Sequence, residues 1–372
     1  MRLLLVSRPF VFHGGVETAT AGLVGALVEQ GYDVHLLSPR GQQAVPGTVL
    51  HTLPWPTLPP FGRLGRVLAL VLGAAAVTRR RSWDVVQSHE RTLTQDVYRA
   101  GEGCHRAYVA SRERGRGPSV YDRLMQALET RVYARTPELV AIARVGRAEI
   151  TRLYGVPPER VTVVYNGVDL ARFHPDRAAR LRGPARDEIG IAPGAWVALF
   201  LGSGFERKGL AVALDAFARV GDGSSRLLVV GKGDVKAYRG RAERLSLDKQ
   251  VLWLGPRPDP ERWLAAADVV VLPSRYEPFG NVHLEALASG VPIVASARAG
   301  GAEVVEDGRT GAVVEPTDAG QVAAALTRVR EMAGRDLVAA CRRAAEPFTY
   351  AAQVAGFEAL YRRRLAARAD FP

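Results

Sequence analysis

The sequence predicts an α/β fold made of two domains, each built around a doubly wound parallel sheet. A chain of 372 residues is too long for one ordinary hydrophobic core. Hydrophobic residues make up 47% of the chain and charged residues 24%, which is typical of a globular protein and not of a disordered one. Short apolar segments alternate with helical segments in two separate stretches, and this alternation favours parallel strands joined by helices.

The first stretch opens with an apolar strand over residues 3–6. A loop that ends in Gly14 and Gly15 follows, and then a helix over 16–30 that stops at Gly31. The remaining strands of this half are expected over residues 32–37, 83–87, 138–142 and 161–164. Together these elements predict an N-terminal domain over residues 1–169.

The second stretch repeats the same pattern. Residues 170–193 are rich in Arg, Pro and Gly and lack strand patterning, so we interpret them as the linker region. Strands are then expected over residues 197–201, 226–230, 251–254, 269–272 and 292–296. We predict a C-terminal domain over 170–349 and a final amphipathic helix within 350–372. In sheets of this kind, ligands bind at the carboxyl ends of the strands, where helix N-termini converge.

The net charge and the composition indicate which kinds of partner and which cellular compartment suit this chain. The net charge is +12, and residues 61–160 hold 18 arginines against 10 acidic residues. Such a cluster suits an anionic partner, although an arginine-rich genome would produce a similar bias. The longest apolar run, over 67–77, is too short to span a bilayer, and we expect its helix to pack on the sheet. Two cysteines without metal or redox spacing agree with a reducing cytoplasm.

The most informative motif runs from Glu277 to Glu285. Glu277 lies in a loop after an apolar strand, and Glu285 lies one turn inside a helix that opens near Gly280. Amides at the start of a helix carry partial positive charge, so those of Gly280, Asn281 and Val282 suit a phosphate group. Because Asn281 and Glu285 are four residues apart, the carboxylate projects over the same helix end, where it could accept two hydroxyls of a ribose.

Three further loops follow strands and could extend such a site. Arg207 and Lys208 follow the first strand of the second domain, where two cations could neutralise a diphosphate; the alternative is a solvated surface pair. Gly14 and Gly15 let the backbone approach a ligand closely, but an ordinary strand–helix turn would look the same. The segment Gly300-Gly301-Ala302-Glu303 follows the next strand and could place further amides near a sugar, or it could form only a tight turn.

Several other chemistries lack their motifs. No Asp-x-Asp sequence is present, so a metal-bridged diphosphate is unsupported, and the histidines lack metal-ligand spacing. A Gly-x-x-x-x-Gly-Lys-Ser/Thr loop is missing, which argues against a P-loop ATPase. No Gly-x-Gly-x-x-Gly follows the first strand, which weakens the case for an NAD enzyme. We therefore expect no metal and no cofactor besides the sugar donor.

The two glutamates, the Arg-Lys pair and the paired glycines occur in the order seen in retaining glycosyltransferases of family four, which this chain resembles over nearly its whole length. Within the family it looks most like the lipopolysaccharide core glucosyltransferase I group, because residues 96–104 resemble that group's Asp-Val-Tyr-x-Ala-x-Asp-x-Cys stretch. Glu102 stands where the group usually has aspartate. Residues 17–19 and 299–303 also depart from the group's pattern.

The resemblance implies a fold of the GT-B type, in which two Rossmann-like domains face a cleft and the C-terminal helix returns to the N-terminal, acceptor-binding domain. It implies transfer of a hexose, most simply glucose, from a UDP-sugar to a hydroxyl with retention of configuration. Arg207 and Lys208 would stabilise the leaving diphosphate, Glu277 would hold the sugar and Glu285 the ribose. By resemblance, Glu102 would lie between donor and acceptor, with His105 as the alternative group.

The resemblance also implies a glycolipid acceptor and a peripheral position on the cytoplasmic face of the inner membrane. Residues 105–135 interleave arginines with Tyr108, Tyr121 and Tyr133, a composition that suits an anionic membrane surface. No nucleic-acid recognition module is visible, so nucleic acid is not expected as a partner. Two alternatives stay open: a family-four transferase of another pathway, such as capsule, other glycolipid or glucan synthesis, and a basic binding protein without catalysis.

Overall fold

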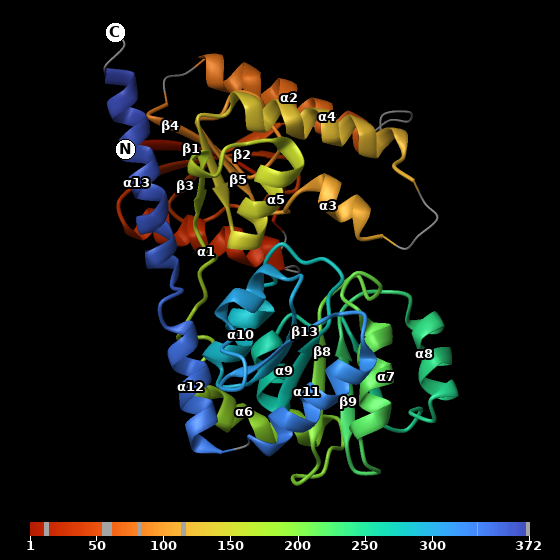
Figure 1. Ribbon diagram of the computed structural model, residues 1–372. Coiled ribbons are helices and arrows are strands. Elements are labelled where there is room, and N and C mark those ends of the chain that lie inside the picture. The colour runs from red at the N-terminus through yellow and green to blue at the C-terminus, as the bar shows by residue number, and fades with distance from the viewer. Residues whose placement is uncertain (11–14, 54–61, 81–82, 113–116, 333, 370–372) are drawn as a thin grey trace. The chain divides into compact units, whose positions relative to one another are not determined.

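The computed structural model describes residues 1–10, 15–53, 62–80, 83–112, 117–332 and 334–369 (Figure 1). Its contacts divide the chain into unit 1, which joins Met1–Gly167 to Tyr350–Pro372, and unit 2, Val168–Thr349. The predicted domain boundary, after residue 169, lies two residues beyond this division. Each unit contains a parallel sheet with flanking helices, so the predicted α/β class with two Rossmann-like sheets is confirmed.

The sheet of unit 1 has the strand order β3-β2-β1-β4-β5-β6-β7, and all neighbouring strands are parallel. Its strands are β1 (Arg2–Val6), β2 (Asp33–Pro39), β3 (Thr48–Leu53), β4 (Val85–Ser88), β5 (Val97–Ala100), β6 (Glu138–Ala141) and β7 (Val161–Val163). Its helices are α1 (Gly15–Glu29), α2 (Gly62–Arg80), α3 (His105–Ala110), α4 (Val120–Arg135), α5 (Arg144–Tyr154) and α13 (Tyr350–Ala369), with a 3-10 turn over Pro158–Arg160.

Alternation along β1 shows why this sheet is covered on both faces. Leu3 and Leu5 belong to the apolar cluster that contains side chains of α1 and α13, whereas Leu4 and Val6 belong to the cluster that contains α2. Successive side chains of a strand point to opposite faces, so a continuous apolar strand needs cover on both. The predicted packing of the helix over 67–77 is confirmed for its inner side, where Leu70 and Ala74 are buried.

The final helix α13 is a structural part of unit 1. Its residues Val354, Phe357 and Leu360 are fully buried in the same cluster as α1. Polar contacts add to this packing, because Arg364 and Arg368 both form ion pairs with Asp96, at 2.9 and 2.8 Å. Helix α13 therefore belongs to the core of unit 1, although the end of unit 2 precedes it in the sequence.

The sheet of unit 2 has the order β10-β9-β8-β11-β12-β13. Its strands are β8 (Val197–Leu201), β9 (Arg226–Val230), β10 (Val251–Gly255), β11 (Val269–Leu272), β12 (Ile293–Ser296) and β13 (Gly311–Val314). Its helices are α6 (Pro175–Glu188), α7 (Leu210–Val220), α8 (Val235–Arg244), α9 (Pro260–Ala266), α10 (Val282–Ala288), α11 (Ala319–Glu331) and α12 (Arg335–Ala345), with a 3-10 turn over Gly300–Val304. The strand order reverses between β8 and β11, as it does between β1 and β4 of unit 1, and such switch points are where doubly wound sheets bind ligands.

The structure corrects the prediction for residues 170–193, which do not form a linker without regular structure. Helix α6 occupies most of this segment, with His174 as its N-cap, Pro175 in its first turn and Pro184 inside it. Arg186 of α6 is only 3% exposed and donates hydrogen bonds to the carbonyls of Ala195 and Ala266, so the helix is fixed to unit 2. Strands β3, β5 and β13 were also not anticipated.

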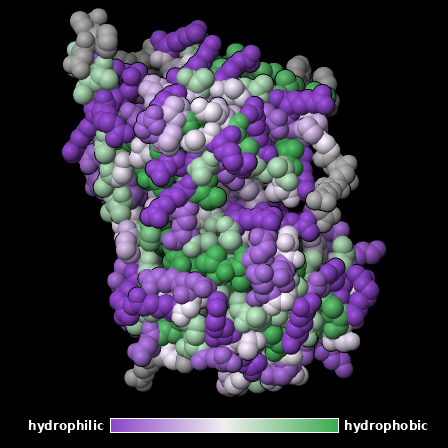
Figure 2. All heavy atoms as spheres, in the orientation of Figure 1, coloured by the Kyte–Doolittle hydropathy of each residue, from purple (hydrophilic) through white to green (hydrophobic). Residues whose placement is uncertain are grey.

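Hydrophilic residues cover most of the face seen in Figure 2, but apolar residues are visible at the upper edge, over α2. There Leu64, Leu68 and Leu72 are 40%, 49% and 67% exposed. Their spacing of four residues places them on one side of the helix, opposite the side that packs on the sheet. No helix in the described ranges combines the length and apolarity that crossing a bilayer requires.

Candidate functional site

The switch point of unit 2 brings together three residues that the sequence singled out. Arg207 and Lys208 lie in the loop after β8, and Glu277 lies in the loop after β11. Because β8 and β11 are neighbouring parallel strands, both loops leave the same edge of the sheet. Arg207 and Glu277 lie 70 positions apart in the sequence, yet the fold brings them into direct contact.

One carboxylate oxygen joins the three residues. Oε2 of Glu277 lies 2.9 Å from Nζ of Lys208 and 2.9 Å from Nη1 of Arg207, which also donates to the carbonyl of Tyr276 at 2.8 Å. Burial alone raises the pKa of the Glu277 carboxyl, but the charges of Lys208 and Arg207 outweigh it and lower that pKa to about 2. Glu277 is therefore an anion throughout the physiological range.

The ion triad of Arg207, Lys208 and Glu277 still has hydrogen-bond donors and an acceptor oxygen that are not used. In the part of the chain that the structure describes, Arg207 uses only Nη1, and Lys208 bonds only to Glu277. Oε1 of Glu277 has no partner there either, because both cations contact Oε2. Guanidinium and ammonium groups can bind several oxygens at once, so the cations could bind phosphate oxygens without releasing Glu277.

The loop that carries Glu277 is held by backbone bonds. Gly280 has a φ of +81°, a left-handed conformation that favours glycine, and its carbonyl accepts a hydrogen bond from Nδ1 of His283 at 2.7 Å. The amides of Gly300 and Gly301 donate to the carbonyls of Glu277 and Phe279. These two amides, considered above as possible ligands for a sugar, are thus already used to fix the loop.

The second glutamate of the motif has the opposite electrostatic character. Glu285 is 8% exposed, and among the described residues its carboxyl group has no hydrogen bond or ion pair. Burial raises the pKa of this carboxyl to about 7, against the smaller lowering effects of the Arg172 and Lys208 charges. A buried carboxyl group without a partner is costly, and an incoming donor such as a hydroxyl would relieve that cost.

The helix that carries Glu285 starts slightly later than expected. Helix α10 begins at Val282 with Asn281 as its N-cap, and the amide of Glu285 donates to the carbonyl of Asn281 at 2.9 Å. Gly280 therefore precedes the helix and does not open it. Asn281 and Glu285 are both 9% exposed or less, so this end of α10 is largely enclosed.

A second charged cluster lies at the switch point of unit 1. Arg8, which follows β1, forms two hydrogen bonds with Glu90, which follows β4, at 2.7 and 3.0 Å. Its Nη1 also lies 2.7 Å from Glu102, which follows β5. Glu102 accepts a second contact from Arg91 at 3.1 Å. The position of Glu102 is thus defined by two arginines that sequence reasoning did not connect to it.

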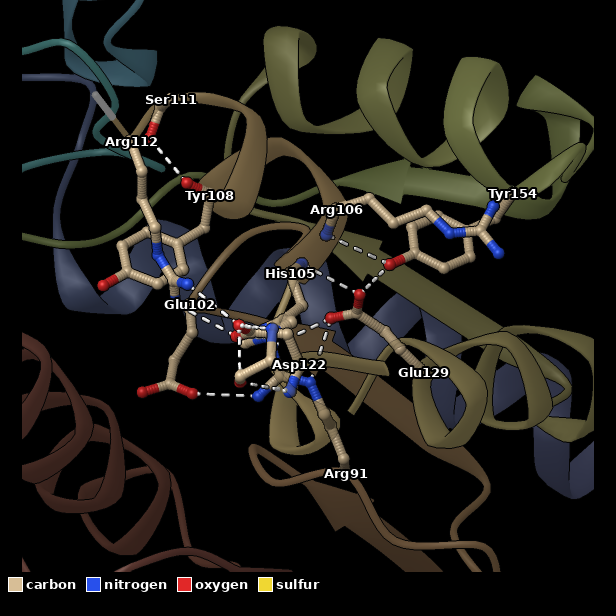
Figure 3. A network of polar contacts seen from close by, with 11 residues as sticks. Arg91, Glu102, His105, Arg106, Tyr108, Ser111, Arg112, Asp122, Glu129 and Tyr154 are labelled. Carbon is tan, nitrogen blue, oxygen red and sulfur yellow. Dashed lines mark hydrogen bonds and ion pairs between the residues drawn. The ribbon is translucent and has the colours of Figure 1, made fainter. Parts of the chain in front are cut away.

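Figure 3 shows the polar contacts that extend from Glu102 through Arg91 to further residues of unit 1. Arg91 contacts Glu129 at 2.9 Å, and the same buried carboxylate accepts hydrogen bonds from the amide of His105 and the hydroxyl of Tyr154. His105 directs Nε2 to Asp122 at 2.9 Å. This ring nitrogen, the alternative to Glu102 near an acceptor, is therefore occupied by a carboxylate that also caps α4.

Glu102 has the character of a permanent anion. Burial by itself raises the pKa of its carboxyl, but the charges of Arg8 and Arg91 and their hydrogen bonds give a net lowering. A carboxylate with a lowered pKa is a weak proton acceptor near neutral pH. Orientation of a hydroxyl or electrostatic stabilisation suits Glu102 better than proton abstraction.

The remaining predicted residues lie elsewhere or outside the described ranges. Gly15 is the first residue of α1, whereas Gly14 falls among residues that the structure does not describe. Tyr133, expected as a surface aromatic residue, is 1% exposed and belongs to the core of unit 1. In the described residues, no group of three or more His, Cys, Asp or Glu side chains is arranged to hold a metal ion.

Sequence reasoning missed Arg8, Arg91 and Arg172. Arg8 follows the first strand of its sheet, the position that Arg207 and Lys208 occupy in unit 2, and this shared position could have identified it. Arg172 was assigned to the linker; it pairs with Glu261 at 2.7 Å and its charge acts on Glu285. Only the folded chain shows that connection.

The raised pKa of Glu285 predicts a pH-dependent gain in stability for Glu285→Gln. Well below pH 4.5 the carboxyl is protonated in both the folded and the unfolded chain, so its ionisation does not affect stability. As the pH rises towards about 7, the unfolded chain releases the proton first, so the penalty on the folded state grows. We expect the stabilisation of Glu285→Gln over wild type to be roughly 2 kcal/mol larger at pH 8 than at pH 5. Denaturant unfolding at both values measures this, with exposed Glu243→Gln as the control; the same difference at both values would contradict the assignment.

Comparison with known proteins places the chain in a family. Residues 13–172 match the family model described as Glycosyltransferase Family 4, and residues 195–331 match the one described as Glycosyl transferases group 1. A D-inositol 3-phosphate glycosyltransferase of Thermomonospora curvata is 36% identical over 220 residues, which cover 55% of this chain and 51% of that protein. The chain spans about half the length of the first curated relatives that it matches.

Solved structures share the fold over the whole chain. WaaG, described as a glycosyltransferase involved in lipopolysaccharide biosynthesis, has a TM-score of 0.80 at 22% identity and covers 96% of this chain and 98% of its own. HepE of Anabaena in complex with UDP-glucose has a TM-score of 0.73 at 19% identity over the full length of both chains. These likenesses show the arrangement of GT-B glycosyltransferases within each domain.

A longer sequence match decides the family. The D-inositol 3-phosphate glycosyltransferase of Nocardia farcinica is 30% identical over 352 residues, which cover 85% of this chain and 75% of the relative. Together with the two matching family models, this similarity shows that the chain belongs to the group 1, family 4 glycosyltransferases.

Proposed function

We propose that this protein transfers a hexose, most simply glucose, from a UDP-sugar to the hydroxyl of an acceptor, with retention of configuration and without a metal ion. The observation that carries this proposal is Glu285, a buried carboxyl without a partner in the described residues, beside an ion triad with unused donors. Solved relatives with the same fold include HepE in complex with UDP and with UDP-glucose, which supports a uridine nucleotide as the donor.

Each residue of the unit 2 site has a role in this proposal. Lys208 and the free nitrogens of Arg207 bind the diphosphate, and the free oxygen of Glu277 accepts hydrogen bonds from the sugar. Glu285 accepts both ribose hydroxyls, since one carboxylate has room for two donors. The amides of Gly280, Asn281 and Val282 and the loop at Gly14 and Gly15 stay predicted contacts to the donor.

The chemical step builds negative charge on the departing diphosphate and positive charge on the sugar ring. Arg207 and Lys208 stabilise the first charge through fixed cations that Glu277 has already oriented. Glu277 and Glu102, both held as anions, stabilise an oxocarbenium-like sugar. Attack by the acceptor on the face that the diphosphate leaves gives retention without a protein nucleophile.

Two acceptor classes are supported by different observations. The motif around Glu102 and the fold shared with WaaG favour a glycolipid such as a lipopolysaccharide core. The named relatives at 30% and 36% identity act, by their names, on D-inositol 3-phosphate, which favours a small phosphorylated acceptor of another pathway. Product analysis with a core lipid and with inositol 3-phosphate separates the two.

For a glycolipid acceptor we propose that the outer face of α4 lies against an anionic membrane. Arg123, Arg131 and Arg135 are exposed there and form no ion pair within the described chain. Val120 and Leu124 on the same helix are 73% and 44% exposed. Cationic side chains beside exposed apolar ones suit the headgroup region of an anionic bilayer on the cytoplasmic side.

The donor site predicts selective loss of nucleotide binding. UDP-glucose should raise the Tm of wild type, while Lys208→Met and Glu285→Gln should bind it about 10–100-fold more weakly, because each loses a charge-assisted hydrogen bond. A thermal-shift titration with UDP-, ADP- and GDP-glucose measures this. Lys249→Met and Glu243→Gln change exposed residues of the same unit and serve as matched controls. Equal shifts in all five proteins would refute the site.

The acceptor side predicts a separation of binding from turnover in Glu102→Gln. The variant should bind UDP-glucose like wild type but transfer the sugar at least about tenfold more slowly, because a preorganised anion near the reacting centre is lost. Donor affinity and product formation are measured on the same preparation, with exposed Glu159→Gln as the control. Transfer at the wild-type rate would exclude Glu102 from the chemistry.

The membrane assignment predicts salt-sensitive binding to anionic vesicles. Wild type should sediment with vesicles that contain phosphatidylglycerol at low salt, but not with pure phosphatidylcholine. The triple variant Arg123→Gln, Arg131→Gln, Arg135→Gln should stay in solution, because it lacks the positive charges that attract the anionic vesicles. The control is the triple variant Arg180→Gln, Arg239→Gln, Arg244→Gln in unit 2, which has the same net charge and should still sediment. Equal loss in both variants would point to unspecific attraction and not to α4.

A further inference from the structure

Arg99 is an unusual residue for the middle of a parallel sheet. It lies on β5, one residue before the strand ends, and is only 2% exposed. Its neighbours Val97 and Tyr98 are core residues on opposite faces of the sheet. Buried arginines in proteins are normally paired, since an isolated cation in the interior is strongly unfavourable.

The guanidinium of Arg99 is mostly without partners. Its Nη2 donates to Oδ1 of Asn166 at 2.6 Å, but Nε and Nη1 are buried without a hydrogen bond, and no carboxylate of the described chain pairs with it. Burial lowers the pKa of Arg99 to about 10, so the group still carries its charge at neutral pH. Three N–H donors and one positive charge are therefore uncompensated.

Arg186 of unit 2 shows what a satisfied buried arginine looks like in the same chain. It is 3% exposed, yet it forms an ion pair with Asp268 at 2.9 Å and donates to the carbonyls of Pro193, Ala195 and Ala266. Burial of an arginine in this chain therefore does not by itself leave its N–H groups without partners, as those of Arg99 are.

A small cavity lies beside Arg99 at the carboxyl edge of the unit 1 sheet. Its volume is about 10 Å³, which is the room that a single oxygen atom needs. Ser7 and His89 also line it, and Oγ of Ser7 is a second buried polar atom without a hydrogen bond. Phe10, Thr20 and Gly101 line it as well. The charged residues of the lining are Glu17, Arg8, Glu90 and Glu102; Arg8 contacts both Glu90 and Glu102, and Arg91 also contacts Glu102.

We propose that Arg99 and Ser7 form a binding site for one oxygen of an anionic group, a phosphate or a carboxylate. The oxygen enters the cavity and accepts hydrogen bonds from the free N–H groups of Arg99 and from the Ser7 hydroxyl. The ligand is either a free anion or an anionic group carried by the sugar acceptor. The residues of this site belong to unit 1 and those that bind the diphosphate belong to unit 2, and its test requires no turnover.

The experiment uses inorganic phosphate as the probe, at constant ionic strength, in the full-length protein. Because phosphate would also compete for the Arg207–Lys208 site, all proteins carry Lys208→Met as the background. We expect phosphate to raise the Tm of this background by about 2 °C or more, and Arg99→Met to abolish the shift. Ser7→Ala should reduce it, and Arg99→Lys should keep part of it.

Arg186→Met is the matched control for burial of an arginine. It should lower the Tm, because Asp268 loses its partner, and it should keep the phosphate shift. Arg99→Met without phosphate should not lower the Tm, because it removes an unpaired charge.

Binding of glucose 6-phosphate separates the two sources of the anion. If it binds more tightly than inorganic phosphate, while glucose does not bind, the ligand is an anionic acceptor; equal affinity identifies a free anion.

Two outcomes overturn the proposal. One is the absence of phosphate binding to the background protein by calorimetry, which would mean that Arg99 and Ser7 are satisfied by a water molecule. The other is a phosphate shift that persists in Arg99→Met. If Arg99→Met does not fold, the calorimetric result and the Ser7→Ala variant still decide the question. Neither outcome affects the UDP-sugar assignment, which is tested with the wild-type lysine in place.

Discussion

The ion triad of Glu277, Lys208 and Arg207 is the interaction on which the candidate donor site depends. A carboxylate that is 9% exposed would ordinarily be protonated or expelled, and here two cations at 2.9 Å keep it ionised. The pairing also joins the loop after β8 to the loop after β11, so it fixes the edge of the sheet where a ligand would bind. Removing one partner from such a buried pair typically costs about 3–5 kcal/mol, since it leaves the other charge uncompensated.

Unit 1 repeats this arrangement with other residues. Arg8 follows the first strand and Glu90 follows the fourth, and they form two hydrogen bonds, whereas Arg207 and Glu277 of unit 2 form one. The shared cause is topology: both sheets reverse their strand order between the first and fourth strands, so the loops after those strands are neighbours. Opposite charges in the two loops hold each switch point together in the absence of a ligand.

Elements and motifs could be predicted from the sequence where the residues of one continuous segment are enough to identify them. Apolar strands and the Glu277–Glu285 motif could be recognised locally, because burial of a parallel strand requires a continuous apolar run. Strand β3 escaped because its residues are only partly buried, and β5 because Arg99 interrupts it. Helix α6 escaped because Pro184 and many arginines suggest a loop, whereas its buried Arg186 is satisfied by distant carbonyls. The partners of Glu102 lie on other strands, so no local pattern could reveal them.

The two glutamates of the motif show how one chain segment provides two different carboxylates. They lie eight positions apart with similar exposure, yet the pKa of Glu277 is lowered to about 2 and that of Glu285 is raised to about 7. Lys208 explains the difference: it bonds directly to Glu277 and reaches Glu285 only through its field. Glu277 is thus stabilised before any ligand arrives, whereas Glu285 stores an unfavourable desolvation that hydrogen-bond donors of a ligand can relieve. A site arranged this way gives up some stability of the free protein for affinity, which is expected of a binding residue and not of a structural one.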